Sequence, residues 1–116
     1  MAEPYLTDLR ILLGRLAPIA GVTQELTCKH FFSGAAAYAA GRIFMTLTPA
    51  GLALKLPPAR RDELLAAGAR PLRYFPNAPV KKAYVILADE MASVDRTLAG
   101  LIAESATFCL SGRGHL

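Results

Sequence analysis

The first part of the chain carries apolar residues at helical spacing. Steps of three and four separate Leu6, Leu9, Leu13 and Leu16. This stripe predicts an amphipathic helix over 5–17, with Arg10 and Arg15 on its polar side. Pro18 has no amide hydrogen for a helical bond, so we expect the helix to end there.

The middle of the chain changes to short, nearly uncharged runs. They predict strands over 23–30, 35–40, 43–48 and 52–56. Gly41-Arg42 is expected to form one tight turn, and Thr48-Pro49-Ala50-Gly51 has the residues of a type I turn. Strands joined so tightly must be antiparallel. Phe44 and Leu54 are expected in the core of this sheet.

The rest of the chain predicts a helix from Pro58 to a C-terminal Gly68, strands over 70–75 and 82–88, and a final helix capped by Ser93. The expected fold class is α+β. It has two layers, with an antiparallel sheet of about five to six strands and three helices. The order is one helix, three to four strands, a helix, two strands and a helix. We expect one domain over 1–110 and a frayed tail over 111–116.

Composition supports a single globular domain. The chain has 116 residues, of which 53% are hydrophobic and 19% charged. No apolar run approaches the ~20 residues of a membrane span, and charges near the N-terminus interrupt any export signal. We therefore expect a cytoplasmic protein with no membrane partner. Cys28 and Cys109 fit a reducing compartment, and the sequence leaves open whether they lie close together.

Positive charge is concentrated in one segment. Residues 55–82 hold seven Lys or Arg against two acids, a net +5, so the remaining residues carry −1 of the total +4. Such asymmetry indicates either an anionic partner or a solvated basic face. The candidate surface for an anionic partner consists of Arg60, Arg61, Arg70, Arg73, Lys81 and Lys82.

The sequence contains no recognisable catalytic or cofactor motif. Its nine glycines are dispersed, so no phosphate-binding loop is indicated. Cys28 and His30 would share one face of a strand, but two ligands do not make a zinc site. The same pair offers a Cys-His nucleophile with no readable orienting acid. We expect no enzyme activity, no cofactor and no metal.

Several motifs resemble the TfoX (Sxy) N-terminal domain family, bacterial proteins associated with regulation of natural competence. They are "FFSG" at 31–34, "YAAGRIF" at 38–44, "LALKL" at 52–56 and "AAGARPLRYF" at 66–75. The resemblance covers about Leu6 to Ala106. It departs at Ser33, where a second glycine is usual. The chain has no room for the helical second domain of many competence regulators.

The resemblance implies a non-enzymatic bacterial regulatory module, related to competence or transcription, that acts through a protein partner. One alternative is weak, sequence-indifferent nucleic-acid binding through the 55–82 segment. A remote alternative is an enzyme that uses Cys28 and His30. The identity of the partner, direct DNA binding and the choice between monomer and homodimer remain open at this point.

Overall fold

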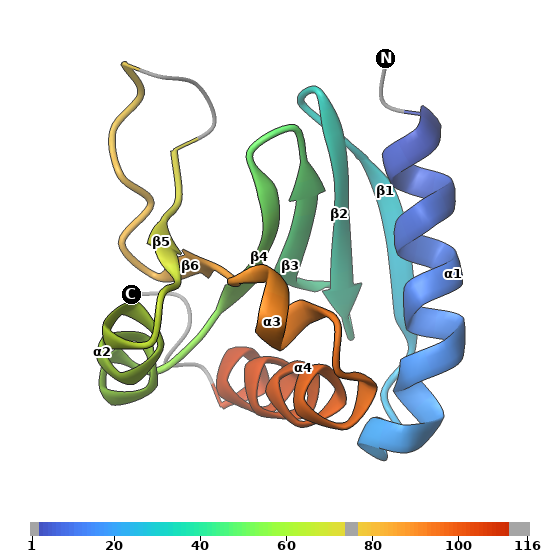
Figure 1. Cartoon of the computed structure of the whole chain (residues 1–116). Coiled ribbons are helices and arrows are strands. Elements are labelled where there is room, and N and C mark those ends of the chain that lie inside the picture. Colours follow the sequence, from blue (N-terminus) through green and yellow to red (C-terminus); the bar gives the residue numbers. More distant parts are fainter. Residues whose placement is uncertain (1–2, 74–76, 112–116) are drawn as a thin grey trace.

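One antiparallel sheet organises the chain, and the computed structural model describes residues 3–73 and 77–111 of it (Figure 1). Four strands precede the second helix and two follow it. The elements are α1 (Glu3–Ala20), β1 (Leu26–Phe31), β2 (Gly34–Ala39), β3 (Arg42–Thr48), β4 (Gly51–Lys55), α2 (Pro58–Ala66), β5 (Arg70–Pro71), β6 (Tyr84–Ile86), α3 (Asp89–Ala92) and α4 (Asp95–Leu110).

The sheet has six strands in the order β1-β2-β3-β4-β6-β5. Every neighbouring pair is antiparallel. The predicted α+β class and strand number are confirmed. β1 and β5 are the two edges, so β1 pairs with β2 alone among the described strands.

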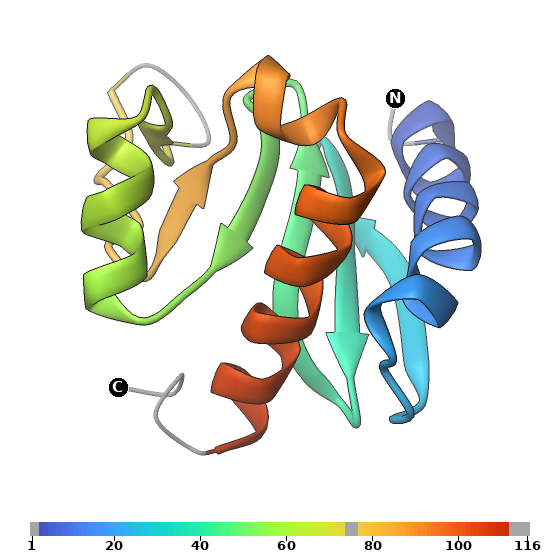
Figure 2. The same ribbon diagram turned by 60° about the horizontal axis from the view of Figure 1, so that its bottom comes forward.

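Helices α1 and α4 pack against each other and against one face of the sheet (Figure 2). The core between them contains the fully buried side chains of Leu9, Leu16, Phe44, Leu54 and Ile102. The predicted core positions Phe44 and Leu54 are thus confirmed. β2 contributes alanines to this layer, and their small side chains let the helices approach the sheet closely. Helix α2 lies beside β6 at the other end (Figure 2).

The turn between β2 and β3 lies one residue earlier than predicted. Ala40 and Gly41 both have positive φ, 50° and 81°, and β3 already begins at Arg42. Two such residues form the tight hairpin turn that suits twisted strands. The pairing shifts register between Ala37 and Tyr38. This irregularity allows the consecutive residues Phe44 and Met45 both to be buried.

Several helix boundaries differ from the prediction: α1 begins at Glu3 instead of at residue 5, and the C-cap of α2 is Ala67 instead of Gly68. Helix α1 continues through Pro18 to Ala20, because a proline in the last turn removes only one bond, and Gly21 with φ 72° follows. Ser93 does not cap the final helix, whose N-cap is Val94. Instead Ser93 ends α3, a short helix missed in the sequence, and its hydroxyl donates to the Glu90 carbonyl.

Three strands are shorter in the structure than predicted. β1 begins at Leu26 instead of Thr23, and β5 contains only Arg70–Pro71. β6 covers Tyr84–Ile86, fewer residues than the predicted 82–88. Residues 74 and 75 of the predicted strand lie outside the described residues, as do 112–116 of the predicted frayed tail. No helix in the described ranges has the length and apolar character needed to cross a membrane.

Candidate partner-binding surfaces

The six basic candidates come from three neighbouring parts of the fold. Arg60 and Arg61 are on α2, Arg70 is on β5, and the others lie in the connection from β5 to β6. This connection projects on the side of the sheet away from α1 (Figure 1). Two bonds shape it: the Lys81 amide donates to the Leu72 carbonyl over 2.9 Å, and Arg73 Nη1 donates to the Ala78 carbonyl over 2.9 Å.

Arg60 is engaged in ion pairs within the protein. Its Nε lies 2.9 Å from Oε1 of Glu104 on α4, and its Nη1 lies 3.5 Å from Oε2 of Glu63. Two carboxylates therefore compensate this guanidinium. Its ion pair with Glu104 links α2 to α4, and the compensated charge adds little to the field of the basic surface.

Arg61 points the other way and contacts the β5–β6 connection. Its Nη1 donates to the carbonyl oxygen of Lys82, while its Nε is buried and has no hydrogen-bond partner among the described residues. A hollow of about 290 Å³ lies here, with Arg61, Asp62 and Lys82 as its charged lining. One carboxylate thus accompanies two cations, so this hollow is only weakly positive.

The remaining basic side chains, those of Arg70, Arg73, Lys81 and Lys82, are exposed. The seventh cation of the segment, Lys55, was not placed among the candidates, and its Nζ lies 5.9 Å from the ring centre of Tyr84. Cross-strand pairing of β4 with β6 creates this contact. These basic side chains can attract phosphate groups, but they do not form a recognition helix that could read base edges.

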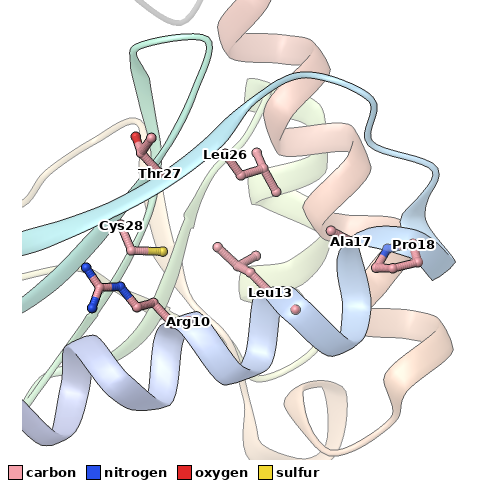
Figure 3. A pocket seen from close by; sticks show the side chains of 8 residues that line it. Arg10, Leu13, Ala17, Pro18, Leu26, Thr27 and Cys28 are labelled. Atoms are coloured by element: carbon pink, nitrogen blue, oxygen red, sulfur yellow. The ribbon is translucent and has the colours of Figure 1, made fainter.

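A second surface, not identified in the sequence, lies between α1 and the edge strand β1 (Figure 3). It is a hollow of about 580 Å³. Leu13 from α1 and Leu26 from β1 point into it, and the side chains of Cys28 and Arg10 lie next to each other in its lining (Figure 3). The full lining is Arg10, Leu13, Gly14, Ala17, Pro18, Leu26, Thr27 and Cys28. Arg10 and Leu13 are three positions apart on a helix, a spacing that could have signalled their shared face.

Both cysteines are free thiols. Burial raises the pKa of Cys28, and the positive charge of Arg10 offsets part of this rise. Burial likewise raises the pKa of Cys109, against smaller opposing effects of Lys55 and Arg42. A raised pKa keeps each thiol protonated near neutral pH, the opposite of an activated nucleophile.

The candidate pair Cys28 and His30 does lie on one face of β1, two residues apart, as the pattern predicted. The described part of the chain holds no group of three or more side chains suited to bind a metal ion. The first of the two surfaces is basic, and the second is a largely apolar hollow.

Comparison with known proteins gives one informative result. Curated proteins and solved structures yield no match. A family model described as the TfoX N-terminal domain matches residues 17–109, from the last turns of α1 to the last turn of α4. The match starts later than the resemblance seen in the motifs, which began near Leu6. Because it spans most of the chain, the protein belongs to the TfoX N-terminal domain family.

Proposed function

We propose that this chain is a non-enzymatic regulatory module of the bacterial cytoplasm that acts by binding a partner protein, in a process related to competence or transcription. Membership of the TfoX N-terminal domain family supports a TfoX-like module. The observation that carries the protein-binding role is the edge position of β1, which pairs with β2 alone among the described strands and lies beside an apolar hollow. A sheet edge offers backbone donors and acceptors to another chain, and a hollow gives that contact side-chain selectivity.

Capture from a bacterial lysate before and after nuclease treatment tests this function. We expect tagged protein to retain the same partner protein after nuclease, because the contact is between proteins. Sequence-matched protein unfolded in urea and coupled to the same resin serves as the control for nonspecific retention. Loss of every retained protein on nuclease treatment would overturn the proposal and favour contact through nucleic acid.

A second candidate function is direct, weak binding of nucleic acid. One observation favours it: the Arg61–Lys82 contact places α2 against the connection that carries the exposed Arg73, Lys81 and Lys82. The binding would be electrostatic and indifferent to sequence, because these side chains are suited to phosphates. Mobility shifts of duplex and single-stranded DNA at low salt test it.

A further inference from the structure

We propose that β1 accepts an extended segment of the partner protein as an added antiparallel or parallel strand, and that this segment alternates apolar and acidic residues. This proposal rests on the protein-binding function proposed above. The segment would bind at the hollow between α1 and β1. The hollow is formed partly by Arg10, Leu13 and Gly14, which precede the family match at 17–109.

The hydrogen bonding between β1 and β2 determines which backbone groups of β1 point away from β2. The Ala40 amide donates to the Glu25 carbonyl over 3.0 Å, and the pairing continues from Leu26 opposite Ala39. In an antiparallel pair, residues alternate between bonding to the neighbour and facing away from it. The N–H and C=O groups of Leu26 and Cys28 therefore point away from β2, toward the edge where an added strand would meet them.

The hollow determines why every second residue of the added segment is apolar. A strand added to a sheet lies ~4.8 Å from its neighbour, and its side chains alternate between the faces. Every second side chain would therefore enter the hollow beside Leu26 and Cys28, against Leu13 and Ala17 of α1. A side chain of valine or leucine size suits such an apolar space, whose burial would stabilise the complex.

The positive charges near β1 determine why the alternate residues of the segment are acidic. Arg10 is the one charged side chain that lines the hollow among the described residues. Lys29 lies on the opposite face of β1, with its Nζ 5.2 Å from the ring centre of Tyr38. No carboxylate pairs with Arg10 or Lys29 among the ion pairs of the described residues. Acidic residues at the alternate positions would face Lys29, and a further one at the end of the hollow would approach Arg10.

A second copy of this chain is a poorer occupant. Pairing two β1 strands would bring the Lys29 residues of both copies into one short stretch of sheet. Like charges opposite each other destabilise a strand pair. Edge lysines are also a common protection against self-pairing. The same lysine that disfavours a second copy favours an acidic segment.

The test uses the full chain labelled with ¹⁵N and a capped six-residue peptide of alternating valine and glutamate. We expect the peptide to shift the amide signals of Leu26 and Cys28 at millimolar concentration or below. A matched peptide of alternating valine and lysine should bind at least about tenfold more weakly, because it reverses the charge that faces Lys29 and Arg10.

A matched pair of glycine variants isolates the hollow. Gly14 lines it, and a Cβ there would meet no atom within 4 Å, so Gly14→Leu should fold and fill the space. Gly100 on α4 is equally open and serves as the control, Gly100→Leu. We expect Gly14→Leu to weaken peptide binding at least about tenfold and Gly100→Leu to leave it unchanged. Thermal melting of both variants confirms that they are folded.

Three results would overturn the proposal. The first is no shift of any β1 amide at millimolar peptide. The second is equal binding by wild type and a folded Gly14→Leu variant. The third is a wild-type dimer in ultracentrifugation that Gly14→Leu converts to monomer, which would assign the edge to a second copy. If Gly14→Leu still retains the nuclease-resistant partner from lysate, the protein-binding function holds and only the assignment to this hollow fails.

Discussion

The hydroxyl oxygen of Ser105 lies 2.7 Å from the carbonyl oxygen of Lys55, which joins α4 to the end of β4. The same hydroxyl lies 3.0 Å from the carbonyl oxygen of Phe44 on β3. A serine has a single hydroxyl proton, so the two carbonyls share it. Ser105 is completely buried, and it links the helix layer to two adjacent strands.

Replacing Ser105 by alanine should destabilise the fold by about 1–3 kcal/mol, because two buried carbonyl groups lose their donor. Urea unfolding followed by circular dichroism measures this change. Thr107→Ala is the control, since Thr107 is exposed on the same helix and should change the unfolding free energy by less than ~0.5 kcal/mol. Equal midpoints for the two variants would show that the shared hydrogen bond contributes nothing.

Replacing Phe44 or Leu54 by alanine should cost about 2–5 kcal/mol each. Both side chains are fully buried between the sheet and the helices, so truncation leaves a cavity as well as losing apolar burial. Ile11→Ala is the matched control on an exposed apolar position, where 61% of the residue is accessible. A melting temperature that both core variants leave unchanged would contradict the observed strand register.

If the basic surface binds nucleic acid, reversing Arg70, Arg73, Lys81 and Lys82 to glutamate should abolish the binding. These side chains are exposed, so we expect the fold to persist. The affinity of wild type should fall steeply with salt, because each neutralised phosphate releases counterions. Mobility shifts of duplex and single-stranded DNA measure both effects.

Arg60→Glu is the control for that experiment, because Glu104 and Glu63 already compensate Arg60. We expect it to lower the affinity much less than the fourfold variant does. A wild-type protein that shifts neither DNA at low salt would eliminate the nucleic-acid function. The basic segment would then be a solvated surface or a contact for an acidic protein.

The Cys28 thiol should react slowly with iodoacetamide at neutral pH. Burial raises the pKa of Cys28 above its ordinary value of 9.0, so little thiolate forms until the solution is more alkaline than that. Arg10→Ala should slow the reaction further, because the positive charge of Arg10 lowers this pKa. Mass spectrometry distinguishes Cys28 from the buried Cys109, which should react more slowly still.

The raised pKa also predicts the direction of the pH dependence of stability. The folded chain keeps the Cys28 and Cys109 protons at a pH where the unfolded chain has lost them. The free energy that these neutral thiols contribute is therefore fully present below pH 9.0 and declines as the pH rises through the folded pKa. Urea midpoints of wild type and a Cys28→Ala/Cys109→Ala variant from neutral to alkaline pH measure the difference. A loss of equal size in both would exclude the thiols as its cause.

The local pattern of apolar and polar residues was sufficient to predict most of the helices and strands. The leucine stripe from Leu6 to Leu16 and the apolar period of the final helix each repeat over several turns, so they leave one interpretation. The tight turns between the predicted strands indicated an antiparallel sheet. Boundaries were less well determined: Pro18 lies within a helix, and Ser93 ends α3 instead of starting α4. At such positions local propensity is small compared with the packing of the whole helix.

Tertiary structure alone decided which charges and apolar residues are free to bind a partner. The sequence placed Arg60 among six similar cations, yet Glu104, 44 positions away, compensates it. Arg61 meets the Lys82 carbonyl 21 positions away. The hollow between α1 and β1 joins Arg10 to Cys28 across an intervening turn. Sequence periodicity reports only neighbours within a helix or strand, whereas these contacts depend on how the helices lie on the sheet and on which strand becomes its edge.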